Sequence, residues 1–328
     1  MERAKVNGRE IVFLERREGD VLGYAVWYTF SRLVQNKDVV KGWFRKYGLS
    51  EFTPDDPNHR DAFKRICSEY KEKRLRSEDG VEVYLLIRPV ERGGNLRKLV
   101  LEKRSGGRKL SYDVVGELEF VRDEKTGYER IERFLETTDP DVRRIVAEIV
   151  DRWEREKDCY TEEHLRRILL DIIDECGRVK LKPSGSVYFV PIEHFHYVER
   201  FSRIVDEIRA GNPENRTEIW FAPIVNTDQF REMVKRKVED TIQETLDSAI
   251  KRLVELSEAE DVDERERARR IGELAARIES AAQIAERYAR MLRMSLNRAE
   301  NLLTEAREIL SKIQRAQTGK FKKRAAIA

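Results

Sequence analysis

The sequence predicts an α+β protein made of an N-terminal mixed domain with an antiparallel sheet, a winged-helix-like module and a C-terminal coiled-coil hairpin of long helices. Apolar residues alternate with period two between residues 80 and 122, which is the signature of strands. Two amphipathic helical patterns precede a Pro-Ser-Gly turn within residues 139–190. From residue 227 onward, apolar residues recur in steps of three and four, as they do in coiled coils.

The N-terminal domain is expected over residues 1–136. Residues 10–16 favour a short strand, whereas the apolar and aromatic stretch 21–34 fits either a buried helix or a strand. Residues 61–74 are expected to form a helix with one apolar face. About four antiparallel strands should follow in residues 80–122.

The middle module is expected over residues 139–226. Two helices, 142–155 and 161–175, are followed by a β-hairpin over 179–190. This order matches the second half of a winged helix, in which the second helix enters the DNA major groove and the wing contacts the backbone. The basic side chains that would face nucleic acid on the second helix and the wing are Arg166, Arg167, Arg178, Lys180 and Lys182.

A further group of basic side chains flanks the Gly106-Gly107 turn. Its members are Lys103, Arg104, Arg108 and Lys109, and they are candidates for contacts with phosphates. The net charge is only +3, so any nucleic-acid contact must come from local patches. The alternatives are that these residues form ordinary solvated faces and that the middle module is purely structural.

The coiled-coil hairpin is expected over residues 227–318, with a short basic, flexible tail at 319–328. Its second arm is predicted as one continuous helix of about 75 Å, roughly twice the length of the first arm. The seam residues expected to meet a partner helix are Ile271, Leu274, Ile278, Leu292, Leu302, Ile309 and Ile313. Because a short first arm cannot cover the whole seam, the remainder should meet the globular domains or another chain, and a homo-oligomer or a protein partner is expected.

The composition points to a cytoplasmic protein. Charged residues make up 39% of the chain, as in the ion-pair networks of thermophilic proteins, although a chain rich in exposed helix gives the same bias. The three cysteines are far apart, so no disulfide framework or zinc motif is indicated. The polar N-terminus does not resemble a signal peptide, and no apolar run is long enough to cross a membrane.

No catalytic motif is recognisable, and no cofactor is expected. Glu193, His194 and His196 are weak candidates for metal ligands, because the two histidines would share one face of a strand. Ordinary surface or capping roles are the favoured interpretation of these histidines. Asp55, Asp56 and His59 could pair as acid and base, but the proline-rich segment that contains them is more typical of a turn.

Three segments carry a resemblance to a known family. The hairpin Lys182-Pro183-Ser184-Gly185-Ser186-Val187-Tyr188-Phe189-Val190-Pro191 resembles a recurrent R-P-S-G-G-V-Y-F-V-P signature, with Lys182 and Ser186 departing from it. Residues 61–65 (DAFKR) and 114–120 (VVGELEF) resemble two further segments of the same family. This is an uncharacterised family of phages, plasmids and some archaea, and the resemblance covers about residues 50–225. It implies a virus or mobile-element context and no activity.

The sequence therefore favours a non-enzymatic protein that binds nucleic acid or a nucleoprotein and uses its coiled coil for self-association or partner binding. One alternative is a structural or adaptor protein without nucleic-acid contact. Another is a novel hydrolase that uses a metal or carboxylates.

Overall fold

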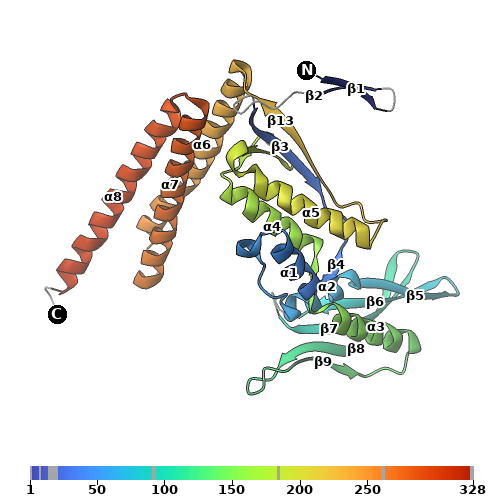
Figure 1. Ribbon diagram of the computed structural model, residues 1–328. Helices are drawn as coiled ribbons and strands as arrows, with labels where there is room; N and C mark the ends of the chain where they lie inside the picture. Colours follow the sequence, from blue (N-terminus) through green and yellow to red (C-terminus); the bar gives the residue numbers. More distant parts are fainter. Residues whose placement is uncertain are drawn as a thin grey trace. The chain divides into compact units, whose positions relative to one another are not determined.

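The computed structural model describes the backbone of residues 2–6, 9–13, 21–90, 94–182, 185–259 and 263–325 (Figure 1). The chain divides into two compact units. The first consists of residues 1–29 and 169–328, and the second of residues 30–168. Each unit has its own sheet and core, and each is described here by itself.

The unit 30–168 is built on a five-stranded antiparallel sheet with strand order β5-β6-β7-β8-β9. These strands are β5 (Glu72–Glu78), β6 (Val81–Pro89), β7 (Leu96–Ser105), β8 (Arg108–Arg122) and β9 (Glu129–Leu135). Residues 80–122 form three strands where about four were expected, because the segments 109–112 and 115–121 belong to the single strand β8. The helix predicted over 61–74 ends at Glu69, and two further strands lie at the edges. The segment Glu72–Glu78 carries a single apolar side chain, Leu75, so this edge strand lacks the alternation that marks a half-buried one.

Three helices accompany this sheet: α1 (Lys37–Lys46), α2 (His59–Glu69) and α3 (Pro140–Glu156). Asn58 and Asp139 cap α2 and α3 by accepting hydrogen bonds from the first backbone N–H groups. The apolar faces of α2 and α3 pack on one face of the sheet, where Phe63, Trp153 and Leu99 are fully buried. The predicted apolar face of α3 is confirmed, because Val142, Ile145, Val146, Ile149 and Trp153 are all buried.

The other unit contains a four-stranded antiparallel sheet with strand order β11-β12-β3-β13. Its strands are β3 (Val21–Thr29), β11 (Val179–Lys180), β12 (Val187–Pro191) and β13 (Glu218–Val225). The sequence allowed either a helix or a strand for the apolar and aromatic stretch 21–34. Its N-terminal part, Val21–Thr29, is a strand. The helix α5 (Phe195–Gly211) packs on this sheet, with the ring of Phe195 stacked 3.7 Å from that of Tyr24.

The β-hairpin predicted over residues 179–190 is present as the paired strands β11 and β12, but it does not stand apart as a wing. Strand β12 pairs with β11 on one side and with β3 on the other, so it is an inner strand of a larger sheet. The helices expected to complete a winged helix are also divided, because α3 belongs to the core of the unit 30–168. The helix α4 (Glu162–Glu175) runs across the boundary between the units.

The long C-terminal helices form a three-helix bundle, not a two-helix hairpin. They are α6 (Asp228–Glu258), α7 (Glu264–Leu292) and α8 (Asn297–Ala325), and they share one core with Leu22, Val179 and Phe189 of the sheet. The predicted 75 Å rod breaks at Arg293, which adopts a left-handed conformation with φ 52°. The N–H of Met294 bonds to the carbonyl of Ala289 (3.2 Å), which is the pattern of a Schellman cap.

The break lets α8 pack beside α6, so the three helices cover each other's apolar stripes. Of the predicted seam, Ile271, Leu274, Ile278 and Leu292 are buried, whereas Leu302, Ile309 and Ile313 are only half-buried. Leu296, directly before α8, and Ala299, Leu303 and Ala306 on α8 are buried. The mismatch in arm length, which led to the expectation that part of the seam meets the globular domains or another chain, is thereby removed.

The predicted flexible tail is also wrong in part, because α8 continues as helix to Ala325. Residues 326–328 lie outside the described part of the chain. Among the described residues, no helix is both long and apolar enough to cross a bilayer.

Candidate functional site

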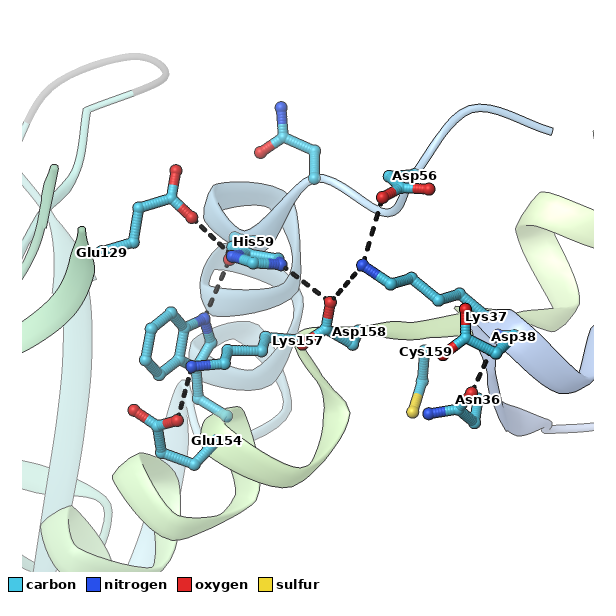
Figure 2. A network of polar contacts seen from close by, with 12 residues as sticks. Asn36, Lys37, Asp38, Asp56, His59, Glu129, Glu154, Lys157, Asp158 and Cys159 are labelled. Atoms are coloured by element: carbon cyan, nitrogen blue, oxygen red, sulfur yellow. Dashed lines mark hydrogen bonds and ion pairs between the residues drawn. The ribbon is translucent and has the colours of Figure 1, made fainter. Parts of the chain in front are cut away.

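A histidine–carboxylate–lysine network joins four segments of the unit 30–168 (Figure 2). His59, the first residue of α2, lies between two carboxylates: its Nδ1 is 2.5 Å from Oε2 of Glu129 on β9, and its Nε2 is 3.3 Å from Oδ1 of Asp158. A neutral imidazole donates only one of these two hydrogen bonds, so the imidazolium form satisfies both. The carbonyl of His59 accepts a hydrogen bond from Nε1 of the buried Trp153 (2.9 Å).

Lys37 extends this network to α1. Its Nζ lies 2.7 Å from Asp158 and 3.1 Å from Asp56, and Asp56 also pairs with Lys41. The backbone N–H of Lys37 bonds to the carbonyl of Asp158 (3.0 Å). Asp56 forms ion pairs with these two lysines, and no hydrogen bond or ion pair joins it to His59.

The ionisation of the network follows from these contacts. The hydrogen bond from Lys37, followed by that from His59, lowers the pKa of Asp158 despite partial burial. Hydrogen bonds from Lys41 and Lys37 lower the pKa of Asp56. With a cation against each of these carboxylates, the arrangement is suited to linking the segments more than to abstracting a proton from a substrate.

Acidification should weaken this link. Asp158 has a lower pKa in the folded state than in the unfolded chain, so its contribution to stability is complete above the unfolded pKa of about 3.9 and is lost as the pH falls below it. Because Asp158 is 38% exposed, we expect Asp158→Asn to cost at most about 1 kcal/mol of unfolding free energy at pH 7. The difference from wild type should shrink progressively as the pH falls from the unfolded pKa through the lower folded pKa, as measured by urea unfolding at pH 7 and at a series of values below pH 4; an unchanged difference across that series would contradict this role.

The histidines of the Glu193-His194-x-His196 segment do not form the predicted strand pair. His194 ends a short 3₁₀ helix (Ile192–His194), and His196 lies in the first turn of α5. Residues two apart on a helix point in nearly opposite directions, so the two rings do not share a face. Across the described residues, no three His, Cys, Asp or Glu side chains are grouped to hold a metal ion.

The basic group around Gly106-Gly107 is partly neutralised. Arg104 and Lys109 both pair with Glu102, a carboxylate with no exposed surface, and Arg104 also pairs with Glu72 (2.7 Å). The guanidinium of Arg104 lies 4.2 Å from the centre of the Tyr84 ring. Lys103 and Arg108 are exposed. The group therefore presents two open cations where four were predicted.

The basic residues assigned to the second helix and the wing lie in different compact units. Arg178, Lys180 and Lys182 belong to the unit containing the four-stranded sheet, and Arg166 and Arg167 to the unit 30–168. Arg178 pairs with Asp174 (2.5 Å) and lies over the ring of Tyr188, whereas Lys180 and Lys182 are exposed.

A groove at the start of α4 is lined by two arginines and two carboxylates of the unit 30–168. It has a volume of about 410 Å³, and its lining includes Arg65, Arg167, His164, Cys159 and Asn58. Burial first, and then the charges of Arg167 and Arg65, lower the pKa of His164. Burial, followed by Glu156 and Asp158, raises the pKa of Cys159, which disfavours a nucleophilic thiolate.

His164 has a local structural role in this groove. Its Nδ1 accepts a hydrogen bond from the backbone N–H of Thr161 (3.1 Å), so the neutral ring carries its proton on Nε2. This is the position where Glu or Gln completes a capping box. Arg166 and Arg167 follow on the exposed side of α4, and neither forms an ion pair with any described residue.

Sequence reasoning missed Glu129, Asp158 and Lys37. They come from β9, the turn after α3 and the start of α1, and nothing in their local sequence distinguishes them from other surface charges. Only the tertiary fold brings them to His59.

Comparison with known proteins identifies a family and no activity. No curated protein and no solved structure matches the chain. The model of a family of unknown function, DUF6744, matches residues 21–319, which include the long helices α6 and α7 that the three short segments of resemblance left out. The chain therefore belongs to the DUF6744 family.

Proposed function

We propose that this chain is a non-enzymatic nucleic-acid-binding protein, serving a virus or mobile element, that contacts the phosphate backbone through the exposed side of α4, beside the groove that Arg167 lines. The observation that carries the proposal is the pair Arg166 and Arg167. These two arginines are adjacent on α4, are exposed, and have no ion pair among the described residues. Phosphate contacts are made by such cations and need no base-specific geometry.

The groove itself supports this assignment. Arg167 and Arg65 line it together, and their charges add to burial, the larger cause, in lowering the pKa of His164. Asp61 and Glu163 also line the groove, which favours a few local phosphate contacts over a long electrostatic track. The bundle α6–α8 is suited to a separate, structural role or to a nucleoprotein partner.

The test is a gel-shift titration with fluorescent duplex and single-stranded oligonucleotides at about 50 mM salt, where backbone contacts are strong. We expect Arg166→Glu/Arg167→Glu to weaken binding by at least about tenfold, because two attractive charges become repulsive. The matched control is Lys125→Glu/Arg133→Glu, which makes the same charge change at exposed positions of the same unit.

Each result decides between the candidate functions. Equal weakening by both double variants would show a response to net charge and would contradict a site on α4. No shift by the wild-type chain would discard nucleic-acid binding and favour the structural or adaptor role. Hydrolysis of the oligonucleotide, abolished by His59→Ala, would favour an enzyme.

A further inference from the structure

Strand β13 is an open edge that carries large aromatic side chains. It is the last strand in the order β11-β12-β3-β13, and among the described residues only β3 pairs with it. Trp220 and Phe221 on this strand are 52% and 39% exposed. An exposed apolar edge is a site for pairing with another strand, and it marks an interaction surface.

The aromatic side chains form a row across the sheet. Trp220 is the register partner of Trp27, and Trp27 is the partner of Val187, so the three side chains share one face. Trp27 is 38% exposed. The row therefore ends at the free edge with its largest and most exposed member.

Pro223 limits where a second strand can pair. Proline has no backbone N–H, and in sheets its nitrogen faces away from the neighbouring strand. The outward-facing residues of β13 are then those in step with Pro223, namely Ile219 and Phe221. These two offer both N–H and C=O groups, so the usable edge is centred on Trp220.

The segment of β13 centred on Trp220 can pair with the same segment of a second copy of the chain. In an antiparallel pair of two β13 strands about a two-fold axis at Trp220, Ile219 of each copy bonds to Phe221 of the other. The two Trp220 residues then form a non-hydrogen-bonded pair with Cα atoms about 4.5 Å apart. The exposed row becomes a continuous line of four tryptophans across the axis.

The adjacent helix α5 fits the same axis. A groove of about 280 Å³ between α5 and β13 is lined by Glu199, Arg203, Asp206 and Arg209. Residue 204 lies seven helical residues, about 10 Å, before the end of α5, and Trp220 lies two residues, about 7 Å, after the start of β13. A two-fold axis near both positions makes the two α5 helices antiparallel and brings Glu199 of one copy toward Arg209 of the other.

From these observations we propose that the protein forms a symmetric homodimer through β13, in which two four-stranded sheets join into one continuous sheet. The occupant of the open edge is a second copy of this chain. In antiparallel pairing about a two-fold axis, the β13 edges of the two copies form hydrogen bonds with each other, so neither β13 edge remains exposed. This surface is distinct from the helical bundle and from the groove on α4.

Light scattering of the full-length chain over a concentration series tests the dimer. We expect a dimer for the wild type and a monomer for Trp220→Lys, because the symmetric pair would place two lysines against each other. The matched control is Val254→Lys, which adds the same charge to an exposed apolar position of α6 and should remain a dimer. Far-UV circular dichroism confirms that both variants are folded.

Cysteine cross-linking tests the register. With Cys159→Ser as background, Glu218→Cys/Ala222→Cys should form a covalent dimer on oxidation, because position 218 faces position 222 of the second copy within disulfide distance. Each single cysteine should not cross-link, since equivalent positions lie about 13 Å apart. A wild-type monomer at every concentration, a dimer that survives Trp220→Lys, or absent cross-linking in the double variant overturns the proposal.

Discussion

Replacing Trp153 by Ala should lower the free energy of unfolding by about 3–5 kcal/mol, which is the range for deletion of a large buried aromatic side chain. Trp153 is completely buried between α3 and the five-stranded sheet, with its ring edge-to-face against Phe120 at 6.1 Å. Its indole N–H also holds the carbonyl of His59. Urea unfolding followed by far-UV circular dichroism measures the change.

Trp153→Phe separates packing from hydrogen bonding. Phenylalanine keeps most of the apolar contact but leaves the His59 carbonyl without its donor, so we expect a smaller loss of about 1–2 kcal/mol. An alanine variant within about 1 kcal/mol of wild type would show that Trp153 does not join α3 to the sheet as described.

Gly23→Ala should destabilise the four-stranded sheet by about 2–3 kcal/mol. A Cβ atom at this position would lie 2.2 Å from the carbonyl oxygen of Val190 and 2.7 Å from the ring of Phe189. Both contacts are closer than atoms can approach, and the first is with backbone on the paired strand β12. Relief requires the strands to separate or Phe189 to leave its place in the core beside Tyr288.

Gly42 provides the matched control. It lies within α1, and a Cβ atom there meets no other atom within 4 Å. Gly42→Ala should therefore stabilise the chain by about 0.5–1 kcal/mol through helix propensity. If both alanine variants had the same effect on thermal unfolding, close packing at Gly23 would not be the cause.

Periodicity predicted most helices and central strands correctly because their burial is one-sided. The apolar face of α3 and the alternation of apolar residues along β6 follow from the surface against which each element packs. The edge strands β5 and β9 carry charges on both faces and gave no such signal. Their positions are fixed by pairing with β6 and β8, which the sequence does not display.

The turn between α7 and α8 was missed for a different reason. The apolar steps of three and four continue through Leu292, Ser295 and Ala299 without interruption, and the left-handed position is filled by Arg293 instead of the usual glycine. A pattern that suits one long helix equally suits two helices sharing a core. The buried face of α6, from Val234 to Leu256, is long enough to pack against both α7 and α8. This packing favours two helices over one long helix.

The candidate site was only partly accessible from sequence. Arg166 and Arg167 were identified because their helix and its exposed side follow from local periodicity. The network around His59 depends on residues separated by 70 and 99 positions, and no motif links them. The relation of Arg104 and Lys109 to the buried Glu102 is likewise a property of the sheet register.

The salt dependence of nucleic-acid affinity tests the central claim most directly. Each phosphate contact contributes about 0.9 to the slope of log affinity against log salt for duplex DNA. If Arg166 and Arg167 both contact phosphates, Arg166→Ala/Arg167→Ala should reduce that slope by about two while leaving the fold unchanged. The same slope for wild type and variant would contradict the assignment of nucleic-acid binding to α4.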